Sequence, residues 1–109
     1  MYKTNEYYVE EMVKNIDFIL EHMNGISKDD LEANEVLSDS MVFRLIQISE
    51  SSKNLSDEYK TKHDDISWGD ITALRNRLVH DYGNVDMTIV YDTLTRDIAE
   101  LKNELSMLL

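Results

Sequence analysis

One stretch of the chain, residues 73–83, concentrates side chains that can do chemistry. It holds two arginines, an asparagine, a histidine, an aspartate and a tyrosine, namely Arg75, Asn76, Arg77, His80, Asp81 and Tyr82. An imidazole can move protons, and guanidinium groups can stabilise the charge that develops on a phosphate during its transfer. These residue types are suited to cleavage of RNA without a metal ion or a cofactor.

The spacing of Arg75 and His80 limits this hypothesis. Residues five positions apart on an ideal helix point about 140° away from each other, so the two side chains cannot share one face. Either the helix ends before His80 and the chain turns it back, or a second copy of the chain completes the site across a twofold axis, and we favour both. By residue type alone, a structural alternative is more common: Arg75 and Arg77 pair with surface carboxylates while His80 caps the helix.

The overall charge restricts where RNA could bind. The chain has 22 acidic residues against 11 basic ones, which gives a formal net charge of -11. Nonspecific affinity for nucleic acid comes largely from neutralising phosphates with Lys and Arg, so RNA chemistry here must use a local positive site. The acidic surface otherwise serves solubility or faces a basic partner.

The composition predicts a single globular domain over residues 1–109, because a chain of this size can bury one core but not two. Cysteine is absent and the three histidines are scattered, so we expect no disulfide, no metal site and no cofactor. No apolar stretch is long enough to cross a membrane, and the N-terminus lacks a basic region followed by an apolar run. We therefore expect a cytoplasmic protein.

Apolar residues recur every three or four positions in several stretches, which predicts amphipathic helices. Proline is absent and glycine occurs three times, so few residues interrupt these helices. Long helices are predicted over residues 2–23, from Ser38 or Asp39 toward 55, and from Asp86 nearly to the C-terminus. Short turns between them favour an all-α antiparallel bundle.

Polar residues mark the starts of the remaining helices. Ser27, with Asp29 and Asp30 in the turn that follows, predicts the N-cap of a short helix that ends near residue 34, and Ser56 predicts the cap of another helical turn. Ser67 and Asp70 have the spacing of a capping box, so a helix that carries the reactive stretch is expected to begin there.

Arg75, His80 and Tyr82 fit an Arg-x4-His-x-Tyr motif, and the chain resembles the HepT-like HEPN ribonuclease toxins in this motif and around it. The flanking stretches 67–71, 75–80, 90–91 and 97–101 are similar to the C-terminal half of that family, and residues 42–50 are similar to its long second helix. The resemblance extends over about residues 8–105.

This resemblance implies a HEPN bundle that forms a homodimer, with Arg75 and His80 of both protomers lining a cleft along the interface. The chain would then be a metal-independent endoribonuclease, the toxin of a toxin-antitoxin pair. Asn76 would assist in the cleft, and Arg44, Glu50 and Arg77 are candidate supporting residues.

The resemblance also implies a protein partner. This would be a small MNT-type nucleotidyltransferase antitoxin that transfers AMP to Tyr82 and so blocks the cleft. The segment after His80 is acidic in this chain, since Asp81 precedes Tyr82, which leaves a second function open. In that alternative the chain is a HEPN subunit of weak or absent activity that binds a nucleotidyltransferase.

Overall fold

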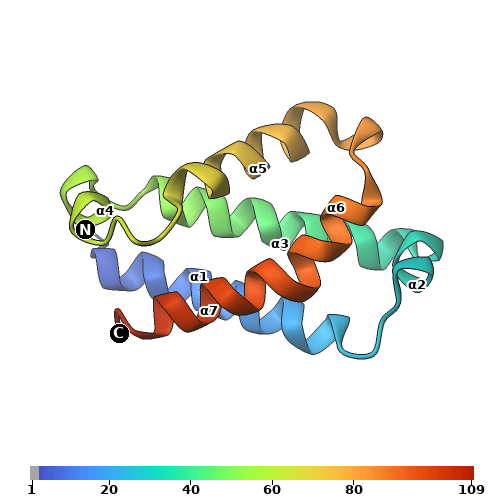
Figure 1. Ribbon diagram of the computed structural model, residues 1–109, viewed down its shortest axis with the longest axis horizontal. Coiled ribbons are helices and arrows are strands. Elements are labelled where there is room, and N and C mark those ends of the chain that lie inside the picture. Colours follow the sequence, from blue (N-terminus) through green and yellow to red (C-terminus); the bar gives the residue numbers. More distant parts are fainter. Residues whose placement is uncertain (1–2) are drawn as a thin grey trace.

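The computed structural model describes residues 3–109, and within this range all regular secondary structure is helical and there is no strand. Figure 1 shows the elements, which are α1 (Asn5–Met23), α2 (Lys28–Ala33), α3 (Glu35–Lys53), α4 (Asp57–Lys62), α5 (Trp68–Asp81), the 3-10 turn η1 (Tyr82–Asn84), α6 (Met87–Asp92), the π-helical segment η2 (Thr93–Asp97) and α7 (Ile98–Ser106). The predicted all-α bundle is confirmed.

The helices pack as an antiparallel bundle built around α1 and α3. These two make the most extensive contact, α5 lies against α3, and α7 lies against α1 (Figure 1). The core is formed by apolar residues at the predicted three-and-four spacing, such as Met12, Ile16 and Ile19 on α1 and Leu45 and Ile48 on α3, all nearly or fully buried. Burying each such side chain contributes about 1.5–3 kcal/mol before the entropic cost of folding is counted.

Two predicted caps have different outcomes. Ser27 forms the capping box of α2, in which its Oγ accepts from the N–H of Asp30 at 3.0 Å and Asp30 Oδ2 accepts from the N–H of Ser27 at 3.2 Å. The capping box predicted at Ser67 is wrong, because Ser67 makes no side-chain cap bond and its ψ of 68° departs from the extended conformation of Ser27, whose ψ is 166°. The helix still begins at Trp68, whose buried indole N–H donates to the carbonyl of His63 at 3.0 Å.

The second long helix begins earlier than predicted. Asn34 caps it, with Oδ1 accepting from the N–H of Leu37 at 3.0 Å, so α3 starts at Glu35 rather than after Ser38 or Asp39. Asp39 therefore lies inside the helix, where its side chain is available to other elements.

The last helix begins at the predicted cap, Asp86, but it is not regular. Residues 93–97 form a π-helical segment between α6 and α7. Here the hydroxyls of Thr93 and Thr95 donate to carbonyls one turn back, those of Ile89 and Tyr91, at 2.9 and 2.8 Å. Such bonds compete with the backbone ladder and bend helices, which accounts for the irregularity.

The extent of α5 shows that one of the two predicted ways to bring Arg75 and His80 together, an end of the helix before His80, is wrong. The helix runs to Asp81, so the chain does not leave it before His80. No residue that breaks helices occurs between Gly69 and Gly83.

Within residues 3–109, no helix combines the length and the apolar character needed to cross a bilayer.

Candidate active site

The residues of the predicted motif lie on different sides of α5. Leu78 faces the core and is 2% exposed, whereas Asn76 and His80, one helical turn apart, are exposed on the outer side. Arg75 lies between these sides, about 140° around the helix from His80. One chain therefore does not bring Arg75 and His80 to a single face.

Arg75 is fixed by a carboxylate on the neighbouring helix. Its Nε donates to Glu50 Oε1 on α3 at 2.9 Å, and one terminal nitrogen donates to Asn76 Oδ1 at 3.2 Å. The Arg75 and Glu50 side chains are 30% and 37% exposed, so this ion pair is partly screened by water. Glu50 would exert its predicted role, which is to orient the arginine, through this direct contact.

A shallow hollow of about 230 Å³ surrounds this ion pair. It is lined by residues of α3 and α5, among them Lys53 and Thr72 in addition to Glu50, Arg75 and Asn76. Lys53 and Thr72 were not predicted from the sequence, although each lies three residues from Glu50 or Arg75 and so on the same helical stripe. Two cations face one carboxylate here, which makes the hollow a local positive site on an acidic protein.

His80 and Arg77 have no partner that holds them. Both are exposed, and among residues 3–109 neither forms an ion pair or a side-chain hydrogen bond. The structural alternative predicted carboxylate partners for both arginines and a capping role for His80; of these, only the partner of Arg75 is present in the described part of the chain.

Tyr82 follows α5 in η1 and contacts the start of α3. Its hydroxyl donates to Asp39 Oδ1 at 2.8 Å, across 43 residues of sequence. Partial burial raises the pKa of Tyr82 above its usual value, and the hydrogen bond to Asp39 raises it further. Nothing in the motif indicated Asp39, because the contact depends on how α3 and α5 pack.

Arg44 belongs to another part of the molecule. Its Nη1 donates to Asn15 Oδ1 on α1 at 2.9 Å, and its guanidinium lies over the ring of Phe18, 3.7 Å from the centroid. These contacts join α3 to α1 and do not reach the hollow around Arg75. The proposed support from Arg44 is therefore at most indirect.

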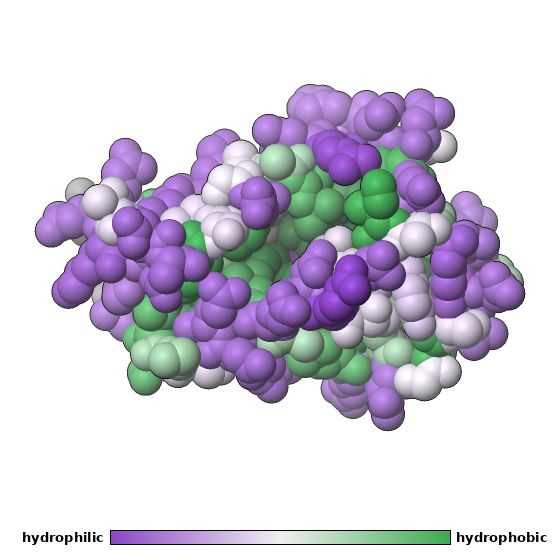
Figure 2. Space-filling model, in the orientation of Figure 1, coloured by the Kyte–Doolittle hydropathy of each residue, from purple (hydrophilic) through white to green (hydrophobic). Residues whose placement is uncertain are grey.

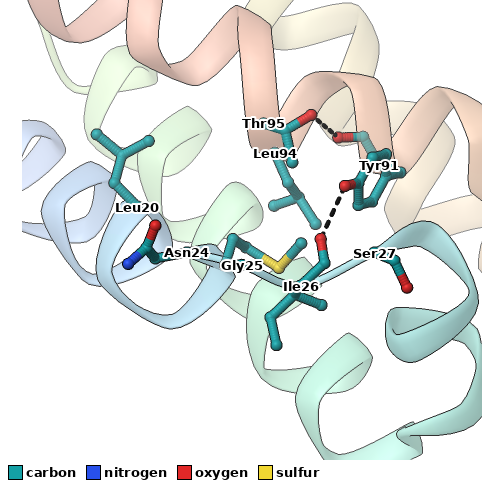
Figure 3. A pocket seen from close by; sticks show the side chains of 9 residues that line it. Leu20, Asn24, Gly25, Ile26, Ser27, Tyr91, Leu94 and Thr95 are labelled. Carbon is teal, nitrogen blue, oxygen red and sulfur yellow. Dashed lines mark hydrogen bonds between the residues drawn. The ribbon is translucent and has the colours of Figure 1, made fainter.

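Another hollow, of about 540 Å³, lies away from all of these residues (Figure 3). It is formed at the turn between α1 and α2, where the hydroxyl of Tyr91 donates to the carbonyl of Ile26 at 2.7 Å. Its lining, which includes Leu20, Asn24 and Thr95, contains no charged side chain. Among residues 3–109, no group of three or more His, Cys, Asp or Glu side chains is arranged to hold a metal ion.

Comparison with known proteins supplies the family. A family profile described as "Ribonuclease HepT-like" matches residues 12–108. A candidate RNase of Caldanaerobacter subterraneus subsp. tengcongensis is 33% identical, over 98% of this chain and 96% of the relative. The "Probable ribonuclease HepT" of Thermococcus cleftensis is 28% identical, over 95% and 94%.

A third relative is longer than this chain. It is a gamma-glutamylcyclotransferase and candidate RNase of Methanocaldococcus jannaschii, 29% identical over 96% of this chain, which spans 47% of the relative. No solved structure matches the chain. The profile match covers most of the sequence, and the chain belongs to the HepT-like ribonuclease family.

Proposed function

We propose that this protein is a metal-independent endoribonuclease and the toxin of a toxin-antitoxin pair. The observation that carries the proposal is the pairing, on one short helix, of an arginine held by Glu50 and Asn76 with an unpartnered histidine one turn beyond Asn76. The relatives described as ribonucleases support an RNA substrate.

The chemistry follows from these groups. The 2′-hydroxyl of a ribose attacks the adjacent phosphorus, the bond to the 5′ oxygen breaks, and the products carry a 2′,3′-cyclic phosphate and a free 5′-hydroxyl. One imidazole takes the proton of the 2′-hydroxyl and another gives a proton to the leaving 5′ oxygen. Arg75 and Asn76 donate hydrogen bonds to the phosphate oxygens as negative charge grows on them.

This mechanism favours a homodimer, because each chain contributes a single histidine to the site. A twofold axis beside α5 would bring two copies of His80 and two of Arg75 into one cleft. Exposed apolar side chains near this face support the arrangement: Val79 precedes His80 on α5, and Val36 and Phe43 flank Asp39 on one stripe of α3. Burial of such side chains against a second copy would stabilise the dimer.

Neutralisation would use Tyr82. We propose that a nucleotidyltransferase antitoxin transfers AMP from ATP to the Tyr82 hydroxyl, with pyrophosphate as the leaving group. Tyr82 lies two residues after His80 and is 36% exposed, so it is accessible to a partner enzyme. The attached phosphodiester is an anion and would compete with the RNA phosphate for Arg75 and His80. With an RNA substrate and this partner, the proposed site of action is the cytoplasm.

The test is cleavage of total RNA by the purified protein in the presence of EDTA. We expect fragments with cyclic phosphate ends from the wild type and none from His80→Ala. His22→Ala is the matched control, because His22 is also exposed but lies at the end of α1. Equal cleavage by wild type and His80→Ala, or cleavage that needs added metal, would overturn the proposed mechanism.

The acidic charge supports a second candidate function, in which the chain is an inactive subunit that only binds the nucleotidyltransferase. Asp81 lies beside His80 and the net charge is -11, both of which oppose RNA binding. Expression of the chain alone separates the two candidates, because a ribonuclease toxin arrests growth and an inert subunit does not.

A further inference from the structure

An apolar groove with an acidic rim lies along the inner side of α5, away from Asn76 and His80. It has a volume of about 360 Å³ and runs between α5 and the last helix. Ile71 and Leu74 of α5 and Ile98 and Leu101 of α7 form its apolar floor. Figure 2 shows this floor as a hydrophobic hollow in the middle of the face, surrounded by hydrophilic side chains.

The groove exists because the helices pack in two pairs, and each helix of a pair lies mainly against the other member. α5 packs mainly on α3, and α7 packs mainly on α1, so the free edges of α5 and α7 face each other across a gap (Figure 1). Ile71 and Leu74 remain half-buried as a result, although their spacing on α5 is that of core residues. A third helical segment would complete their burial.

The rim of the groove has one sign of charge. Asp70, Asp97, Glu100 and Glu104 line it, and no Lys or Arg does. Asp97 lies 3.8 Å from the guanidinium of Arg96, whereas the other three carboxylates form no ion pair among residues 3–109. The groove therefore combines an apolar floor with unneutralised negative charge.

We infer that this groove is a docking site for a cationic amphipathic helix of a partner protein. Such a helix would place apolar residues at i, i+3 or i+4, and i+7 in the groove, and its Lys and Arg would meet the acidic rim. The volume admits roughly two or three large apolar side chains, which is the usual set of anchors for a helix in a groove.

The negative charge of the rim argues against two other occupants of the groove. Phosphate would be repelled by the rim, so RNA is expected on the outer side of α5, where Arg77 and His80 lie. A second copy of this chain would have to meet these carboxylates with basic side chains, of which it has 11 against 22 acidic ones, and the proposed dimer uses a different face, where Phe43 and Val79 are exposed. The inference does not depend on ribonuclease activity, because groove and proposed active site occupy different sides of α5.

The test uses a synthetic helical peptide of leucine and lysine, with leucines at i, i+3, i+4 and i+7, titrated into the full chain by calorimetry. The control peptide carries glutamate in place of lysine. We expect the first peptide to bind and the second not to bind. Methyl NMR signals of Ile71, Leu74 and Leu101 should shift on binding, while those of Ile16 and Ile48 on the buried side of α1 and α3 should not.

A pair of charge variants distinguishes binding in the groove from nonspecific electrostatic attraction between peptide and protein. Glu100→Lys with Glu104→Lys should weaken binding at least about tenfold, whereas Glu10→Lys with Glu21→Lys, two exposed sites on α1, should weaken it less than about threefold. Equal weakening by both pairs, or NMR shifts outside the groove, would overturn the inference. It would also fail if the wild type self-associates and Leu74→Glu abolishes that association, because a second copy would then be the occupant.

Discussion

At the scale of single residues, Arg75 shows how the structure prepares a cation for a phosphate. A free arginine samples many rotamers, and the contacts to Glu50 and Asn76 restrict it to one region beside the hollow. The remaining guanidinium N–H groups stay available to a ligand. Glu50 is therefore expected to act through Arg75 rather than on the substrate, as a positioning residue.

Glu50→Ala should lower the kcat/KM of RNA cleavage by roughly three- to tenfold, because Arg75 loses its anchor but keeps its charge. The folding free energy should change by less than about 1 kcal/mol, since the pair is partly exposed. Cleavage rates and chemical denaturation measure the two effects. Asp17→Ala is the control, because it breaks the 2.6 Å ion pair with Lys102 on the α1 and α7 side; a similar loss of activity there would refute the positioning role.

The hydrogen bond from Tyr82 to Asp39 predicts a dependence of stability on alkaline pH. Partial burial, then Asp39, raises the pKa of Tyr82, so the folded chain holds the phenol proton more tightly than the unfolded chain. This contribution to stability is complete below about pH 10 and is lost as the pH rises through the folded-state pKa. The free energy of unfolding should therefore differ most between wild type and Tyr82→Phe below pH 10, and the difference should shrink above it.

Denaturant unfolding between pH 7 and 11 measures this difference, and absorbance at 295 nm follows the phenol directly. Tyr59→Phe is a useful comparison, because burial also raises the pKa of Tyr59, with Glu6 as the second cause. Asp39→Asn should lower the pKa of Tyr82 without returning it fully to the ordinary value. A Tyr82 titration unchanged by Asp39→Asn would show that the contact is absent in solution.

The residue scale also shows what the sequence could predict of the candidate site. Arg75, His80 and Tyr82 were recognisable because they match the motif of a known family, and Glu50 was a candidate because the same resemblance implied it. Asp39 and Lys53 were not recognisable, because their relevance depends on which turns of α3 lie opposite α5. Arg44 lies six residues before Glu50 and therefore about 120° around the helix from it, and its guanidinium lies over the ring of Phe18 on α1.

At the scale of elements, the helix starts show why boundaries are harder to predict than helices. Several Ser, Asp and Asn residues precede each apolar run, and any of them can serve as the N-cap. Asn34 is used at α3 in place of Ser38 or Asp39, since its Oδ1 accepts from the N–H of Leu37 and the helix begins about one turn earlier. Ser27 and Ser56 form the caps that were predicted for them, whereas Ser67, with a ψ of 68°, makes no side-chain cap bond.

This difference makes a matched pair of substitutions informative. Ser27→Ala should destabilise the chain by about 1 kcal/mol, or roughly 4–8 °C in Tm, because it removes one half of the capping box of α2. Ser67→Ala should cost less than about 0.5 kcal/mol, because Ser67 makes no cap bond. Thermal unfolding followed by circular dichroism measures both. A loss at Ser67 equal to that at Ser27 would mean that the Ser67 hydroxyl does cap α5.

At the scale of the whole molecule, the bundle itself followed from apolar periodicity, but its open side did not. Periodicity tells which face of each helix is buried and not which helix buries it, so the spacing of Ile71 and Leu74 does not distinguish a closed core from an open groove. In the structure they border the groove between α5 and α7. The three sides of α5 thereby face α3, the groove and the exposed surface that carries His80.

The exposed side of α5, which carries His80, bears on how many chains form one active site. If the two histidines of a dimer act as acid and base in one cleft, a dimer with one His80→Ala subunit is inactive. Mixing equal amounts of wild type and His80→Ala, with time for subunit exchange, should leave about a quarter of the activity of wild type at the same total concentration, because only a quarter of random dimers keep both histidines. Subunits that act independently would leave about half.

Native mass spectrometry confirms exchange in this experiment, because the mixed dimer differs in mass from both homodimers. Phe43→Glu should dissociate the dimer and abolish cleavage if the exposed face of α3 and α5 is the interface, since Phe43 is 54% exposed there. Met107→Glu is the control, because Met107 is 86% exposed near the C-terminus, beyond α7. Full activity of a monomeric Phe43→Glu variant would show that one chain suffices, and the roughly 140° between Arg75 and His80 would then require a substrate that spans two sides of α5.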